Sequence, residues 1–237
     1  MSGPHRDRGR PKSASELMAE LRNDPASVAQ RKQQEDDRRT SIARYRSAAR
    51  GVLAALAAVG CEVDLVGDLR KLGRPYPEAV PILVRWLPCV GDSSVKEDIV
   101  RTLSVPWASD AAADLVAAFE RADDGTGSGL RWVIGNALEV VANDAVADGL
   151  MRIATNRHFG KAREMVVVGL GKLKDPRAVD VLLKLRDDDE VVGHAVMALG
   201  MLRTERARPR LEFLLEHPKR WVRHEARNAI RSIDNAR

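Results

Sequence analysis

Apolar residues recur at helical spacing through most of the chain, and the pattern falls into pairs of helices. In the clearest pair, KDPRAVDVLLKLRDDDEVVGHAVMALGMLR (174–203), an Asp-Pro opening precedes an apolar stripe of helical period. Proline is tolerated in a first helical turn, where its missing N–H has no helical partner. The acidic run 187–190 then supplies a turn, and its carboxylates suit the positive end of a second helix. The stretch therefore predicts a two-helix hairpin.

The second helix of this hairpin contains a small residue followed by an aliphatic one, and this signature recurs. It is found at Thr102-Leu103, Ala137-Leu138, Gly169-Leu170, Ala198-Leu199 and Ala229-Ile230, at intervals of 35, 32, 29 and 31 residues. Such intervals are typical of solenoids, and a hairpin with this much apolar surface must stack on its copies. We expect first helices near 76–88, 109–122, 144–155, 176–187 and 207–217, and second helices near 93–104, 129–142, 161–173, 190–203 and 219–233.

These repeats resemble a known family. DPRAVDVLLKLRDDDEVVGHAVMALGML is similar to the HEAT-like repeat of the phycobilisome (PBS) lyase type, and KRWVRHEARNAIRSI is similar to the second helix of the same module. The resemblance implies an all-α fold, a right-handed α-solenoid of about five HEAT-like helix pairs with an N-terminal helical cap. For function, it implies a binding scaffold more often than any one reaction.

The N-terminal third differs from the repeats. We expect a disordered basic tail over 1–12, N-terminal helices that cap the array over 13–75, and the HEAT-like array over 76–237. Between Pro25 and Val59 only Gly51 interrupts a helical pattern, which predicts a long helix or a helix pair with a break near Gly51. A short helix is expected over 61–73, ending at Gly73.

Charge is distributed unevenly along the chain. The formal net charge is +5, with +5 in residues 1–50, −5 in 51–200 and +5 in 201–237. In the tail, Arg8-Gly9-Arg10-Pro11 resembles the core of an AT-hook, which lies in the narrow minor groove of A·T-rich DNA. A solvated basic tail is the favoured alternative, because a match this short arises easily by chance.

Candidate contact residues emerge when the second helices are aligned on their signature. The position seven residues before the aliphatic residue is occupied by Lys96, Arg131, Arg163, Val192 and Arg223. The next position is occupied by Glu97, Trp132, Glu164, Gly193 and His224. If second helices line the concave side of the solenoid, the cations form a basic ladder there. The predicted partner-binding residues are Lys96, Arg131, Trp132, Arg163, Glu164, Arg223 and His224.

A structural interpretation of the ladder is favoured over the binding one. Each arginine would then brace the turn of the preceding repeat by pairing with its acidic loop, for example Asp187 and Asp188. A possible anion site is formed by Arg157, His158 and Lys161, which precede a predicted helix N-terminus. For that segment, an ordinary cationic surface loop is the commoner outcome.

The sequence contains no recognisable catalytic signature. The five histidines have no metal-ligand spacing, and the glycine-rich segment 125–129 follows a helix rather than a strand. No nucleophile-elbow motif is present. We therefore expect no enzyme activity, no cofactor and no metal. Cys61 and Cys89 lack CxxC spacing and are predicted to be buried thiols in a reducing cytoplasm, and no targeting or membrane-spanning segment is visible.

The predicted function is a non-enzymatic scaffold or adaptor that binds a partner protein on the concave face of the solenoid. The alternative is a nucleic-acid-binding HEAT-like protein, suggested by the basic ends and the hook-like tail. A glycosylase-like DNA-repair activity is a weaker alternative, because the acidic middle of the chain opposes a phosphate track. A lyase activity is also weaker, because nothing outside the repeats supports it.

Overall fold

The computed structural model describes residues 13–15, 18, 24–123 and 129–236. These residues form helices joined by turns, with no strand among them. The chain divides into two compact units, Met1–Ser47 and Ala48–Arg237. The hook-like residues Arg8, Gly9, Arg10 and Pro11 lie outside the described residues.

A single long helix, α2 (Pro25–Ala57), contributes to both units. At its start, the carboxylate of Asp24 accepts a hydrogen bond from the backbone N–H of Ser27 at 2.8 Å. The part of α2 in the first unit is highly charged and mostly exposed, with local pairs such as Arg39 to Glu35 at 3.1 Å. Pairs four residues apart support a helix that has little packing of its own.

The end of α2 packs into the second unit without a break. Gly51 remains helical, and a Cβ atom there would lie 2.2 Å from the ring of Trp86. The glycine therefore makes room for a packed indole, so of the two alternatives the single long helix is the one observed. Within 61–73, the short helix is the 3-10 helix η1 (Val66–Lys71), and Gly73 follows with a φ of +67°.

Five helix pairs follow, close to the predicted ranges. The first helices are α3 (Val80–Trp86), α5 (Ala112–Arg121), α7 (Ala147–Thr155), α9 (Arg177–Lys184) and α11 (Arg208–Phe213). The second helices are α4 (Ser93–Leu103), α6 (Leu130–Val141), α8 (Glu164–Gly169), α10 (Val192–Leu202) and α12 (Arg220–Asp234). Short 3-10 helices extend several of them: η2 (Pro77–Ala79), η3 (Pro106–Ala111), η4 (Asp144–Val146), η5 (Arg157–Arg163), η6 (Leu170–Lys172), η7 (Leu185–Asp187), η8 (Glu205–Ala207) and η9 (Leu214–Glu216).

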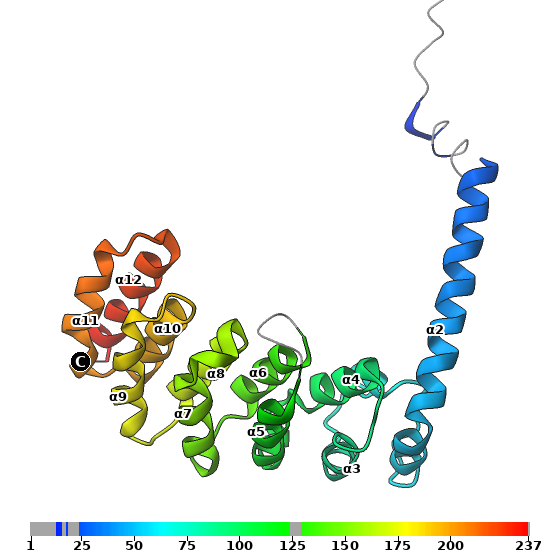
Figure 1. Ribbon diagram of the computed structural model, residues 1–237, viewed down its shortest axis with the longest axis horizontal. Helices are drawn as coiled ribbons and strands as arrows, with labels where there is room; N and C mark the ends of the chain where they lie inside the picture. The colour runs from blue at the N-terminus through cyan, green and yellow to red at the C-terminus, as the bar shows by residue number, and fades with distance from the viewer. Residues whose placement is uncertain (1–12, 16–17, 19–23, 124–128, 237) are drawn as a thin grey trace, which may run out of the picture. The chain divides into compact units, whose positions relative to one another are not determined.

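The pairs of the second unit stack in chain order as two layers of helices (Figure 1). In one layer α4, α6, α8, α10 and α12 each pack on the next, and in the other α5 packs on α7 and α7 on α9. Small residues allow this close approach: a Cβ atom on Gly171 would lie 2.9 Å from the Cα of Ala198, and one on Gly200 would lie 3.0 Å from the Cα of Ala229. The predicted all-α solenoid is confirmed.

The two cysteines differ in their surroundings. Cys61 is buried, as predicted, and Cys89 is exposed, so the prediction of a buried thiol is wrong for Cys89. The reason is local, since Cys89 lies in the surface turn after α3. None of the described helices combines the length and the apolar character needed to cross a bilayer.

Candidate partner-binding face

The arginine of the third helix pair, Arg163, points into the fold. Its side chain is fully buried, and its guanidinium donates to the carbonyls of Gly160 at 2.9 Å and Ala154 at 3.0 Å. It also bonds to carboxylate oxygens of Asp188 and Glu190, each at 2.9 Å. Ala154 lies in the last turn of α7, where carbonyls need donors and a cation suits the helix dipole. Arg163 therefore caps α7, the first helix of its own pair, and links this helix to the acidic turn of the next pair.

The carboxylate of Asp188 is stabilised in its charged form by this contact. Burial raises the pKa of Asp188, but the hydrogen bond and the charge of Arg163 lower it, and the net pKa lies below the ordinary value. Arg157 approaches the same carboxylate, with 3.4 Å between its Nε and an oxygen of Asp188. One of the three residues of the predicted anion site, Arg157, is thus directed at an acidic residue.

The other two members of the predicted anion site are exposed. His158 and Lys161 lie in η5, where Gly160 interrupts the helical backbone with a φ of 52°. The backbone N–H of His158 is already bonded to the side chain of Asn156 at 3.1 Å. All three predicted residues lie in η5, just before the short helix α8 begins at Glu164, and the anion site stays a prediction.

Arg131, in the second pair, is directed inward in the same way. Only 8% of it is exposed, and its Nε donates to the carbonyl of Phe119 at 3.1 Å while Nη2 donates to that of Ala122. The guanidinium also lies 5.0 Å from the ring centroid of Phe159, within the range of a cation–π contact. Phe119 and Ala122 are at the end of α5, so Arg131 also caps the first helix of its own pair.

Arg223 repeats the arrangement in the fifth pair, donating to the carbonyls of His217 at 2.7 Å and Pro218 at 2.9 Å. These three arginines brace the ends of first helices, but not through the predicted pairing with the acidic loop of the preceding repeat. The bonded carbonyls belong to the same pair, and the carboxylates bonded by Arg163 belong to the following repeat rather than the preceding one. As placed, Arg131 and Arg163 present almost no surface to a partner.

The remaining predicted contact residues are more accessible. Trp132 and Glu164 are half-buried at the outer side of α6 and at the start of α8, and His224 is exposed on α12. Lys96, in the first pair, lines a cavity of about 410 Å³ together with Leu87 and other residues of neighbouring helices. Among the described residues, its ammonium group has no ion pair. Contact between these residues and a partner protein stays a prediction.

A set of exposed or half-buried side chains lies on the solvent-accessible side of the second helices. Its members lie six or two residues before the signature aliphatic residue, or two after it, and positions four apart share a helix face. We call this surface the second-helix face; it includes Trp132, Asn136, Met197, Met201 and Asn228. Met197 is 37% exposed and Met201 43% exposed, which is high for large apolar side chains.

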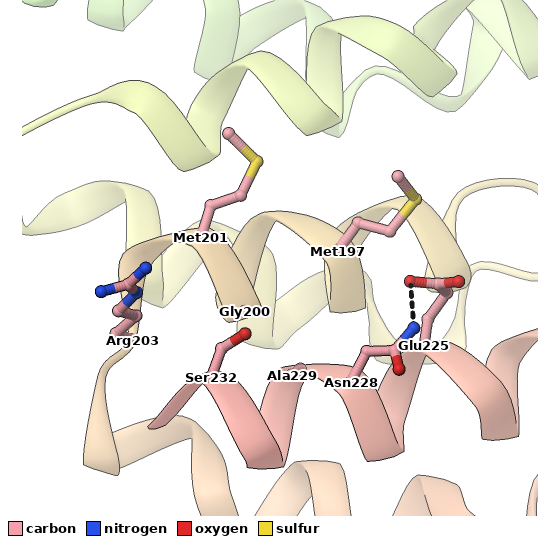
Figure 2. Close-up of a pocket in the computed structure, with 8 residues that line it drawn as sticks. All are labelled: Met197, Gly200, Met201, Arg203, Glu225, Asn228, Ala229 and Ser232. Carbon is pink, nitrogen blue, oxygen red and sulfur yellow. Dashed lines mark hydrogen bonds between the residues drawn. The ribbon is translucent and has the colours of Figure 1, made fainter. Parts of the chain in front are cut away.

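Two of these helices enclose a shallow groove on this face (Figure 2). The groove has a volume of about 430 Å³, with Met197 and Met201 projecting from α10. On α12 it is lined by Glu225, Asn228 and Ser232, and the Nδ2 of Asn228 lies 3.5 Å from a carboxylate oxygen of Glu225. Methionine adapts its shape to irregular partners, so the groove is suited to an apolar side chain.

A tryptophan ring covers part of α10 next to the second-helix face. The ring of Trp221 covers Gly193, because a Cβ atom on that glycine would lie 1.9 Å from the ring. The same ring meets His194 edge-on, with 5.4 Å between centroids. Burial lowers the pKa of His194, and the charge of Glu164 opposes this shift.

The methionine groove was not predicted, because the charged positions of the second helices do not point to it. A usable signal was present, since Met197 and Met201 lie four residues apart on a helix whose other large side chains are mostly buried. In the part of the chain that the structure describes, no group of three or more His, Cys, Asp or Glu residues is placed to hold a metal ion.

Comparison with known proteins identifies the repeats. Residues 162–188 and 191–217 match the PBS lyase HEAT-like repeat, so the predicted resemblance is confirmed and the chain carries HEAT-like repeats. No curated protein sequence matches the chain.

Solved structures of repeat proteins are similar in fold. A designed armadillo repeat protein in complex with the peptide (KR)4 aligns with 93% of this chain and 100% of its own, at 16% identity and a TM-score of 0.50. A structural-genomics target described as an engineered protein aligns with 72% of this chain and 89% of its own, at 20% identity and a TM-score of 0.48. A second designed armadillo repeat protein aligns with 71% and 91%, at 16% identity and a TM-score of 0.45. At these identities the likeness concerns the fold alone.

Proposed function

We propose that the protein is a non-enzymatic scaffold that holds a segment of a partner protein against the second-helix face. The observation that carries the proposal is the groove between α10 and α12, where Met197 and Met201 remain exposed. Exposed apolar side chains that gather on one surface mark interaction sites more often than isolated ones do. Repeat proteins commonly bind through such an extended face.

The buried arginines support this proposal through rigidity rather than through contact. Arg131 and Arg163 fix the ends of their first helices, and Arg163 also links two neighbouring pairs. A pre-organised surface binds with a smaller loss of conformational entropy than one that must first become ordered. A designed protein of similar fold was solved with a bound peptide, which supports peptide binding as a use of this architecture.

The partner segment should present at least one apolar side chain to the methionine groove. Glu225 and Asn228 at its edge supply a carboxylate and an amide for polar contacts, which set orientation more than affinity. We also propose a reducing, cytoplasmic location, supported by the two free thiols of Cys61 and Cys89.

The experiment is an affinity purification from a lysate of the source organism, with nuclease added to half of each sample. Three baits are compared: the wild-type chain, a Met197→Ser/Met201→Ser variant, and a Phe213→Ser control. Phe213 is 68% exposed and lies on α11, in the other helix layer, so its loss removes comparable apolar surface elsewhere.

We expect a discrete, nuclease-resistant protein with the wild type and the Phe213→Ser control, and its loss with the double methionine variant. Circular dichroism of each bait must show an intact fold. Capture that survives the methionine changes but is lost with Phe213→Ser would place the binding surface on the other layer and contradict the proposal.

A further inference from the structure

The last helix of the chain carries a line of basic residues along its outer side. Arg220, His224, Arg227 and Arg231 are spaced four, three and four residues apart, and all four are exposed. Such spacing places side chains on one helix face. At 1.5 Å of rise per residue the line is about 16 Å long. We call it the basic stripe.

The basic stripe lies opposite the apolar face of the same helix. The buried residues of α12 are Val222, Ala226, Ala229 and Ile233. With about 3.6 residues per turn, these residues and the stripe are centred on opposite sides of the helix. The apolar face packs on α10 and α11. It is therefore unavailable for insertion into a lipid surface, which a membrane-bound amphipathic helix requires.

Two other arginines of the last helix pair are paired with acids. Arg206 lies 2.6 Å from a carboxylate oxygen of Asp180, and Arg208 pairs with Asp234. The stripe is different, because within the described residues Arg220 and Arg227 make no ion pair. Arg231 bonds to the neutral amide oxygen of Asn228. Within the described residues, the positive charge of the stripe is therefore not compensated by ion pairs, whereas Arg206 and Arg208 nearby are neutralised.

We propose that the basic stripe binds the phosphate backbone of double-stranded nucleic acid without sequence preference. Guanidinium groups match phosphate oxygens geometrically, and a line of uncompensated arginines favours a regularly charged ligand. Apart from the imidazole of His224, the stripe contains no aromatic side chain on which the bases of a single strand would stack. It also lacks the apolar centre of a typical protein interface. None of the four stripe residues lines the methionine groove, although Arg231 bonds to Asn228 at its edge and His224 lies on the second-helix face. The inference rests on the charge of the stripe and does not depend on the proposed function.

The test measures fluorescence anisotropy of a labelled 20-base-pair duplex of arbitrary sequence, titrated with the full-length chain at several salt concentrations. The stripe variant is Arg220→Gln/Arg227→Gln/Arg231→Gln. A matched control, Arg85→Gln/Lys174→Gln/Lys184→Gln, removes the same charge at exposed positions elsewhere. A third variant, Arg8→Gln/Arg10→Gln, isolates the hook-like tail.

We expect the stripe variant to lose roughly tenfold in affinity per arginine at 0.1 M salt, with a salt slope smaller by about 0.9 per arginine. The matched control should keep the wild-type slope. Three results overturn the proposal: no salt-dependent binding by the wild type, an unchanged slope in the stripe variant, or loss of binding only in the tail variant. Displacement of the duplex by polyglutamate as efficiently as by unlabelled duplex would also overturn it, because the stripe would then be a general polyanion surface.

Discussion

Replacing Arg163 by methionine should destabilise the array strongly. The change keeps an unbranched chain of similar length but removes donors to two carbonyls and two carboxylates. Asp188 is 4% exposed and would be left as a buried charge, and losing one partner of a buried pair costs about 3–5 kcal/mol. The pair with Glu190 adds little, because that side chain is 42% exposed. Since Arg157 still lies 3.4 Å from Asp188, we expect the lower end of the range, about 3 kcal/mol.

The assay is urea unfolding of the full-length chain, followed by far-ultraviolet circular dichroism. A loss of about 3 kcal/mol corresponds to a melting temperature lower by roughly 6–12 °C for a unit of this size. The control is Arg206→Met, which breaks a pair whose side chains are 60% and 52% exposed and should cost less than about 1 kcal/mol.

Asp188→Asn added to Arg163→Met should restore part of the lost stability, because it removes the uncompensated charge. The bracing argument is refuted if Arg163→Met costs no more than Arg206→Met, or if Asp188→Asn restores nothing.

Three further predictions concern neighbouring contacts. Because the pKa of Asp188 is lowered in the fold, its contribution is present above the ordinary aspartate pKa of about 3.9 and is lost as the pH falls through the lowered value. Wild type should therefore lose stability below pH ~4 more steeply than Asp188→Asn in urea titrations, and equal slopes would contradict this. Gly193→Ala should displace the ring of Trp221, costing about 1–3 kcal/mol and shifting tryptophan emission to the red, and the shift should disappear in a Trp221→Phe background. Tyr76→Phe removes a buried hydroxyl that donates to the carbonyl of Thr102 at 3.0 Å, and thermal melts should show a loss of about 1–2 kcal/mol rather than none.

The helix pairs could be predicted from sequence because each depends on local information repeated five times. The apolar period, the Asp-Pro opening at Asp175 and the acidic turns locate the helices to within a few residues. The role of Gly51, in contrast, depends on a residue that is distant in the sequence. Its helical conformation and its lack of a side chain make sense only with the ring of Trp86, which is distant in sequence.

The spacing of Arg131 and Arg163 in the sequence does not show whether their side chains point into the fold or toward solvent. A long side chain near a helix start can turn back over the preceding turn or extend to solvent. In Arg131 and Arg163 the inward direction follows from unsatisfied carbonyls at the end of the adjacent first helix, a tertiary feature. The outer position of Met197 and Met201 likewise depends on how α10 is rotated in its layer. Periodicity alone predicted an apolar helix there and did not say which apolar residues stay exposed.

Partner binding at the second-helix face can be tested by site-specific photo-crosslinking of the chain in cells of the source organism. A benzophenone amino acid replaces Met197 on the second-helix face in one variant and Phe213 on the other layer in a second variant. If the partner binds the second-helix face, we expect a discrete protein adduct from position 197 and none from position 213. An adduct formed only from position 213 would contradict this expectation.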